Sequence, residues 1–363
     1  WINSSGTISI YFKCYTSKKI ILITYKKIKS YISFSTILIT LILIFVSPSH
    51  SKNFELRKVS DANAVCNNSK VAKYHFAKAK EDSGKWLIYF EGGGSGWPAK
   101  YFKDRKPYHK QPTKKRKISD LAIGKQFHKL GYNVIWIHYC SSDLHGGNHI
   151  NSIDGKEVPF KGRLIVKSII NEHAKALSQA QDFVIAGTSA GVYGIVLNLD
   201  ILSSFNNVRL ILDGIWRDDF QKSAEVKKPE WFNQTDDWVP YLLDKMPDHC
   251  DGDFYKNCWV DRKTLDKHNI KNAFIIMNYG DPYNFVNQDS QKEKFISAFK
   301  SDAEYFGGGF SIDAKKFKLA GAVKWGHGLL MEGKYYNKKI DGDPLASLIE
   351  QWVNGKKPIF IRY

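Results

Sequence analysis

Short apolar runs rich in β-branched and aromatic residues recur along the chain, and each is bounded by Gly, Asp or Lys. Runs of this length and composition are typical of buried strands in a mostly parallel sheet. We therefore predict strands at residues 86–90, 134–137, 183–186, 208–212, 273–277 and 317–323.

Helical patterns lie between these runs. Apolar residues recur at near-helical spacing within 164–177, and the apolar segment 190–202 follows the strand 183–186 directly. Because strands alternate with helices, we expect an α/β fold with helices on both faces of the sheet. No repeat or Gly/Ser linker divides the chain beyond the first 50 residues, so residues 54–363 are predicted to form a single domain.

The first 50 residues follow a different pattern. Six lysines and no acidic residue lie there, and the ten-residue apolar run 37–46 is followed by small polar residues. A basic lead, a short apolar run and small residues are typical of a signal peptide. The alternative is a membrane anchor, but the run is shorter than the roughly 20 apolar residues that span a bilayer. We assign residues 1–50 to an N-terminal lead and signal peptide, which predicts a secreted or periplasmic protein and no stable membrane span.

Composition and charge further narrow the class of protein and the partners that we expect. The chain has 363 residues, 43% hydrophobic and 25% charged, which excludes a disordered chain or a coiled coil. Its net charge is +18, and residues 100–117 hold nine basic residues against Asp104. That segment is either a solvated loop or a contact for an anionic polymer. No nucleic-acid motif accompanies the charge, so nucleic acid is not an expected partner.

Four cysteines lie outside the lead, at positions 66, 140, 250 and 258, and they allow three pairings. Export favours disulfides. Cys250 and Cys258 bracket a short polar loop, where closure is easiest, which leaves Cys66 for Cys140. The alternative is four free thiols in a cytosolic protein.

The candidate chemistry begins at Gly187-Thr188-Ser189-Ala190-Gly191, between the predicted strand 183–186 and a helix. This G-x-S-x-G pattern in a strand-to-helix setting is a nucleophile elbow, in which a tight turn lifts the serine hydroxyl clear of the sheet.

An oxyanion hole needs backbone N–H groups from the residue after the serine and from a Gly-rich turn after an earlier strand. The segment 91–97 (EGGGSGW) follows the strand 86–90 directly. Its glycines let the backbone approach a substrate closely. We predict Ala190 as the first donor and this Gly-rich turn as the second source of donors.

A serine nucleophile needs a histidine base and a carboxylate that orients it. In the α/β-hydrolase order the base follows the last strand, which favours His327, the last histidine of the chain, after the run 317–323. Two aspartates end apolar strands after Ser189, namely Asp213 and Asp281. The usual position, one strand beyond the one after the nucleophile, favours Asp281 and leaves Asp213 as the alternative.

Together these residues resemble the pectin acetylesterase and Notum-like carboxylesterase family of secreted α/β-hydrolases. The run Tyr139-Cys140-Ser141-Ser142-Asp143, beside the Gly-rich turn and the elbow, is the most specific part of the resemblance. The other matching positions are Ala64-Val65-Cys66, Tyr74, residues 86–88 and 91–94, Phe160-Lys161-Gly162-Arg163, Asp213-Gly214, Asp281 and His327.

The resemblance implies a serine esterase with these groups: Ser189 as nucleophile, Asp281 as acid, His327 as base, and the amides of Gly93, Gly94 and Ala190 as oxyanion donors. It implies deacylation, most of all deacetylation, of a carbohydrate such as acetylated pectin, without metal or organic cofactor. The alternatives are Notum-like deacylation of a lipidated protein and a binding module that kept the fold and lost turnover.

The chain also departs from the family pattern. A Trp-Cys pair commonly follows the glycines in the family, whereas here Ser95-Gly96 intervene and Pro98 follows Trp97. A cysteine commonly follows the histidine, and here Gly328 does. One family disulfide is therefore missing, and the acyl length of the substrate stays open.

Overall fold

The structure is a computed structural model. It describes residues 8–13, 20–25, 53–81, 83–96, 102–103, 110–222, 241–245, 247–250, 258–279, 281, 289–313, 327–331, 333–340 and 343–362. The chain divides into two compact units, Trp1–His50 and Ser51–Tyr363.

In the first unit, β1 (Ile8–Lys13) pairs antiparallel with β2 (Ile20–Tyr25), a hairpin that the sequence pattern did not predict. The predicted signal-peptide run 37–46 lies outside the described residues. The assignment of residues 1–50 as a cleaved lead therefore stays a prediction.

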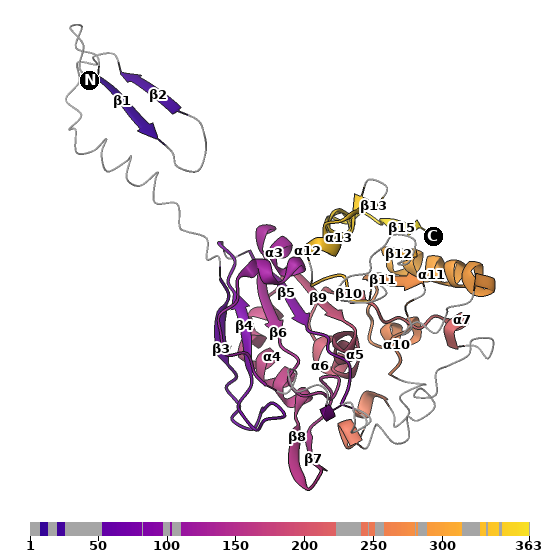
Figure 1. Ribbon diagram of the computed structural model, residues 1–363. Coiled ribbons are helices and arrows are strands. Elements are labelled where there is room, and N and C mark those ends of the chain that lie inside the picture. Colours follow the sequence, from indigo (N-terminus) through magenta and orange to yellow (C-terminus); the bar gives the residue numbers. More distant parts are fainter. Residues whose placement is uncertain are drawn as a thin grey trace. The chain divides into compact units, whose positions relative to one another are not determined.

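The second unit is built on one large sheet (Figure 1). Within the described residues it has nine strands in the order β15-β12-β11-β10-β9-β5-β6-β4-β3. From β15 to β6 all neighbours are parallel, and β4 and β3 complete the sheet antiparallel. The strands are β3 (Glu55–Lys58), β4 (Lys73–Ala77), β5 (Lys85–Phe90), β6 (Asn133–Ile137), β9 (Asp182–Thr188), β10 (Val208–Asp213), β11 (Ala273–Tyr279), β12 (Gly309–Asp313) and β15 (Ile359–Arg362).

The predicted mostly parallel sheet is confirmed, and five of the predicted runs are strands of it. The sixth run, 317–323, lies outside the described residues. The strands that sequence reasoning missed lie toward the two edges of the sheet, where polar residues interrupt the apolar pattern, as in β3 and β4. One expectation was wrong, because β15 follows His327 in the chain and the histidine therefore does not follow the last strand.

Helices cover both faces of the sheet, as expected. Along β5, Trp86, Ile88 and Phe90 point to one hydrophobic cluster and Leu87 and Tyr89 to the other, because successive side chains of a strand alternate. The first cluster lies under α4 (Gly162–Ser178), α5 (Ala190–Leu197) and α11 (Lys292–Phe306), and the second under α3 (Ala122–Lys129) and α13 (Leu345–Val353).

Smaller elements complete the described parts of this unit. They are η2 (Ile118–Asp120), the hairpin β7 (His149–Ile153) and β8 (Lys156–Phe160), α6 (Leu199–Leu202), α7 (Asp219–Lys222), η4 (Asp248–Cys250), α10 (Arg262–Lys267), η6 (Asp289–Gln291), α12 (Gly333–Tyr336), β13 (Lys339–Ile340) and β14 (Asp343–Pro344). Among the described residues, the helices are too short or too polar to cross a membrane.

The helix predicted over 190–202 is broken in two, into α5 and α6. Asn198 lies at the break, and its side-chain Nδ2 donates to the carbonyls of Gly194 at 2.8 Å and His145 at 3.0 Å. Asparagine competes in this way for backbone partners and favours helix ends. The break ties the end of α5 to the loop that contains His145.

Both predicted disulfides are present, Cys66–Cys140 and Cys250–Cys258. The first joins segments 74 residues apart in sequence. Because Cys140 lies just beyond β6, this bond anchors the start of the 139–147 loop, by which we mean residues 139–147.

Candidate active site

Ser189 occupies the turn between β9 and α5, with φ 54° and ψ −119°. A positive φ is unfavourable for a residue with a side chain, and such strain is found mostly at functional sites. The flanking glycines are required by space: a Cβ atom on Gly191 would lie 2.2 Å from the carbonyl oxygen of Phe90, and one on Gly187 would lie 2.8 Å from Gly191. The predicted elbow is therefore built as the motif requires.

The Gly-rich turn passes directly beside this serine, because β5 and β9 are neighbours in the sheet. A Cβ atom on Gly92 would lie 3.2 Å from the Cβ of Ser189. The predicted oxyanion donors Gly93 and Gly94 follow in the chain, and Gly94 has a φ of 73°. Ala190, the third predicted donor, is the first residue of α5 and is buried. The Gly-rich turn and the start of α5 thus both lie next to Ser189.

The 139–147 loop supports the Gly-rich turn. The carboxylate of Glu91 accepts from the backbone N–H of Tyr139 at 3.1 Å, and the N–H of Gly96 donates to the carbonyl of Ser142 at 2.7 Å. The Nε2 of His145 bonds the carbonyl of Glu91 at 2.9 Å. Residues 139–143, which carry the most specific part of the family resemblance, therefore hold the Gly-rich turn in place.

Asp143 fixes this loop to the rest of the domain. Its carboxylate accepts from the hydroxyl of Ser141 at 2.6 Å and from the N–H of Gly162 at 2.7 Å, at the start of α4. Burial raises the pKa of Asp143 to about 7, although these hydrogen bonds oppose the shift. Nearby, the Arg163 guanidinium donates to the carbonyl of Leu197 at 2.7 Å and so holds the end of α5.

His327 and Asp281 form a buried pair, with 2.7 Å between Nδ1 of the imidazole and Oδ2 of the carboxylate. Burial alone would lower the pKa of His327, but the charge and hydrogen bond of Asp281, with the charge of Asp213, raise it above its usual value. A carboxylate at Nδ1 keeps the proton on that nitrogen and directs Nε2 toward proton transfer. This is the arrangement that a serine nucleophile needs.

Asp213, the alternative acid, has a different set of partners. Its Oδ2 accepts from the hydroxyl of Thr188 at 3.0 Å and from the N–H groups of Leu329 at 2.6 Å and Leu330 at 3.0 Å. Burial raises the pKa of Asp213 to about 6. Asp213 therefore fastens the segment that carries His327 to the last residue before the nucleophile.

The turn after β10 contacts both the elbow and the His327 ring. The N–H of Ser189 donates to the carbonyl of Asp213 at 2.9 Å. A Cβ atom on Gly214, where φ is 85°, would lie 3.0 Å from the His327 ring. Gly328 has a φ of 80°, and a Cβ there would lie 2.7 Å from the methyl group of Thr188. A cysteine at position 328 would thus be strained in this chain, which accounts for the glycine.

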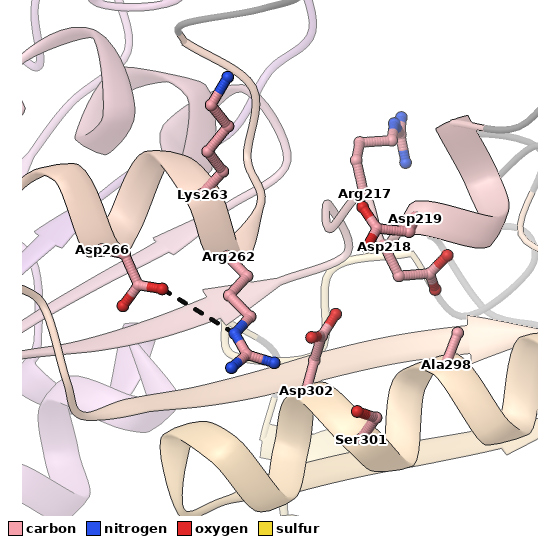
Figure 2. A pocket seen from close by; sticks show the side chains of 9 residues that line it. All are labelled: Arg217, Asp218, Asp219, Arg262, Lys263, Asp266, Ala298, Ser301 and Asp302. Carbon is pink, nitrogen blue, oxygen red and sulfur yellow. Dashed lines mark ion pairs between the residues drawn. The ribbon is translucent and has the colours of Figure 1, made fainter.

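A charged cavity of about 450 Å³ opens beyond the same turn, and sequence reasoning missed it. Figure 2 shows the Arg262 side chain reaching from α10 toward Asp302 on α11, with an Arg262–Asp266 ion pair at 3.9 Å. The charge of Arg217 opposes the rise in the pKa of His327, so this cavity is linked electrostatically to the base. The lining residues are Arg217, Asp218, Asp219, Arg262, Lys263, Asp266, Ala298, Ser301 and Asp302.

Comparison with known proteins gives consistent matches. The family model described as Pectinacetylesterase matches residues 48–233, a stretch that contains the Gly-rich turn, the elbow and Asp213 but ends before Asp281 and His327. Palmitoleoyl-protein carboxylesterase NOTUM of Mus musculus is 28% identical over 160 residues, which is 41% of this chain and 31% of that protein. Pectin acetylesterase 11 of Arabidopsis thaliana is 28% identical over 151 residues, 39% of this chain and 38% of that protein.

The matched stretch thus spans about a third of the length of these relatives. The structure of the Wnt deacylase Notum from Drosophila superposes with a TM-score of 0.59 at 20% identity, over 84% of this chain and 93% of that chain. This likeness shows that the chain has the α/β-hydrolase-like fold that its sequence predicted.

Proposed function

We propose that this chain, which belongs to the pectinacetylesterase family, is a serine carboxylesterase. It removes acyl groups, most of all acetyl groups, from a carbohydrate such as acetylated pectin. The observation that carries the proposal is the strained Ser189 beside the Gly-rich turn, with the His327–Asp281 pair lying on Gly214.

In the first half-reaction, the Ser189 hydroxyl attacks the ester carbonyl while Nε2 of His327 takes its proton. Asp281, held at Nδ1, stabilises the imidazolium that forms. The C–O bond to the alcohol then breaks, His327 returns the proton to the departing alcohol oxygen, and the acyl group remains on the serine.

Negative charge develops on the former carbonyl oxygen during the attack. We assign its stabilisation to the N–H groups of Gly93, Gly94 and Ala190, which come from the two sides of the nucleophile. Fixed donors in a water-poor site are worth on the order of 3 kcal/mol each in the transition state. In the second half-reaction His327 takes a proton from a water molecule while the water oxygen attacks the acyl carbonyl carbon. The bond between that carbon and Oγ of Ser189 then breaks, His327 returns the proton to Oγ, and the carboxylic acid leaves.

A second function is supported by the relatives. Those named palmitoleoyl-protein carboxylesterases match this chain as well as the plant pectin acetylesterase does. The same triad would deacylate a lipidated protein, since the two activities differ in acyl length and in the group that carries the ester. The alternative is therefore a Notum-like deacylase, and an inactive binding module remains the non-enzymatic one.

We also propose that the protein works in a secreted or periplasmic location. Its two disulfides are typical of proteins that fold in an oxidising environment. The predicted signal peptide in residues 1–50 would direct this export. The exposed basic residues 114–117 would then face the medium and attract an anionic polysaccharide.

The test of the nucleophile is covalent labelling. A serine-directed fluorophosphonate should label Ser189, and Ser189→Ala should lose both the label and most of kcat while staying folded, because the remaining donors give only residual catalysis. Ser204→Ala is the matched control, since that exposed hydroxyl donates only to the carbonyl of Ile201. Full turnover in Ser189→Ala would contradict the proposal.

The test of the substrate is acyl length. Aryl esters from acetyl to long-chain acyl are compared by kcat/KM, beside acetylated polysaccharides. Preference for acetyl esters together with release of acetate from the polysaccharide supports the carbohydrate esterase. A preference that grows with chain length supports the lipidated-protein alternative.

A further inference from the structure

Three side chains form a hydrogen-bonded row behind the Gly-rich turn, and the proposed chemistry does not use them. Glu91 opens the turn after β5, His138 follows β6, and His75 lies in β4, so they come from three neighbouring strands. Nδ1 of His138 bonds the Glu91 carboxylate at 2.9 Å, and its Nε2 bonds Nδ1 of His75. Nε2 of His75 bonds the carbonyl of Lys114 at 3.0 Å.

This row is largely shielded from water. His75 is fully buried, and the His138 side chain is 9% exposed. Trp136 packs against both rings, at 4.5 Å from His138 and 5.6 Å from His75 between ring centroids, and Phe54 lies 5.7 Å from His75. A hydrogen bond lost here is not easily replaced by water, so its loss is costly.

The row has more hydrogen bonds than two neutral imidazoles have N–H groups. It runs between two acceptors, the Glu91 carboxylate and the Lys114 carbonyl, and has three hydrogen bonds. Each bond needs one proton, whereas two neutral imidazoles carry two N–H groups between them. We propose that the row of Glu91, His138 and His75 holds a third, buried proton, and that this proton keeps the Gly-rich turn in its active position. The second part of this proposal rests on the proposed function.

The charge that comes with this proton belongs on His138. Burial would raise the pKa of Glu91, but His138 and the N–H of Tyr139 bring it below its usual value, so Glu91 is a carboxylate. Burial, the neighbouring His138 and the charge of Arg116 lower the pKa of His75 to about 4, so His75 is neutral. The row is then a Glu91–His138 ion pair, with side chains 18% and 9% exposed, followed by a neutral, fully buried imidazole.

Other groups face this row from the surrounding elements. Tyr89 lies on β5, and burial raises its pKa well above the usual value, so it stays neutral. His145 lies on the 139–147 loop, and burial lowers its pKa to about 4. It is therefore neutral, and its Nε2–H donates to the Glu91 carbonyl. Arg116, on the segment before η2, is the cation that faces His75.

The row is coupled to the nucleophile through the backbone of Glu91. The N–H of Glu91 donates to the carbonyl of Ile137 at 3.1 Å, its carbonyl is held by His145, and the next residue, Gly92, lies against Ser189. If the third proton is lost, one of the three bonds becomes a contact between two acceptors. The repulsion displaces Glu91 and with it the turn, so activity declines as the pH rises through this ionisation.

The first test does not depend on activity. Nitrogen-15 NMR of histidine-labelled protein counts the protons on each ring, and His75→Phe identifies the His75 signals. We expect the rings of His75 and His138 together to hold three nitrogen-bound protons at neutral pH. Only two protons on these rings throughout the range in which the protein is folded would overturn the proposal.

The second test is Glu91→Gln, which keeps the acceptor and removes the charge. The imidazolium loses its counterion, so the basic limb of the pH profile of kcat should move on the order of one pH unit toward acid, with KM for an aryl acetate unchanged. Glu172→Gln is the matched control, because Glu172 accepts from the Tyr74 hydroxyl and the Ser60 N–H. An unmoved limb would overturn the coupling.

The two proposals fail differently in these experiments. If Ser189 takes the fluorophosphonate label and the basic limb does not respond to Glu91→Gln, the row has no part in positioning the turn. If Ser189 is not labelled, the proposed function fails. The NMR count of protons on the row still tests the third proton by itself.

Discussion

Two histidine–carboxylate pairs lie near the nucleophile elbow, one buried and one largely shielded from water, and they differ in the surroundings of the second ring nitrogen. His327 meets Asp281 at 2.7 Å and His138 meets Glu91 at 2.9 Å, each through Nδ1. Nε2 of His138 is committed to His75. A carboxylate beside a histidine therefore does not by itself identify a catalytic base, because the base must also present its other nitrogen to the substrate.

The pairs also differ in their supports. His138 and Glu91 directly follow β6 and β5, which are joined by a parallel ladder, so their positions are set by the sheet. Asp281 lies just beyond the end of β11, and Asp213 fastens the segment after His327 through the N–H groups of Leu329 and Leu330. We expect the first pair to act as a fixed support and the second as the reacting group.

The largest expected effect distinguishes the two candidate acids, Asp281 and Asp213. Asp281→Asn should lower kcat by about 10⁴, the cost of losing the correct histidine tautomer in a serine triad. Asp213→Asn keeps an oxygen that accepts hydrogen bonds and should cost far less. Steady-state kinetics of both folded variants makes the comparison, and the reverse ranking would transfer the role to Asp213.

A glycine beneath the base offers the next largest effect. Gly214→Ala places a Cβ atom 3.0 Å from the His327 ring, and a displacement of about 1 Å can cost on the order of 100-fold in rate. Gly131→Ala is the matched control, because Gly131 has nearly the same φ, 86°, with nothing within 4 Å. Both variants should lose similar stability, and only Gly214→Ala should lose kcat. Equal activities would mean that the imidazole is not seated on this turn.

The pH profile tests whether the Asp281 carboxylate raises the pKa of His327. His327 accepts a proton only when neutral, and its pKa is raised above 6.5, so kcat/KM should rise with pH through that raised value. Asp281→Asn removes the anion that raises the pKa of His327, and the acid limb should move to lower pH. The raised pKa also stabilises the fold below pH 6.5, and this contribution is lost as pH rises through the folded-state value. If the acid limb of the pH profile did not move in Asp281→Asn, the His327–Asp281 pair would not be the group that titrates in catalysis.

The smallest effect concerns the surroundings of the first pair. Residues 114–117 are exposed and basic, and the carbonyl of Lys114 ends the row that contains His138. Replacing Lys114, Lys115, Arg116 and Lys117 with glutamine, or raising salt, should increase KM several-fold for an anionic acetylated polysaccharide, because exposed charges are screened over about 10 Å at 0.1 M salt. A neutral aryl acetate should respond little. An equal response of both substrates would count against an anionic substrate.

Much of the fold follows from local patterns that can be read along the chain. Apolar runs marked the central strands, since strands buried on both faces need no polar residues. The elbow at Ser189 and the Gly-rich turn were also readable, because a tight turn places its steric demand on adjacent residues. The break of the predicted helix at Asn198 was not, since the side chain there bonds His145, 53 residues away in the chain.

The pairing of residues distant in sequence was decided by the tertiary structure. Asp213 and Asp281 both end apolar strands, and only the packing of the segments beyond β10 and β11 places Asp281 on His327, 46 residues away. The row of Glu91, His138 and His75 likewise exists only because β5, β6 and β4 are neighbours in the sheet. The sequence by itself determined which residues are chemically capable. The fold determined which of them meet, because a hydrogen bond acts over about 3 Å and its partners here are brought together only by long-range packing.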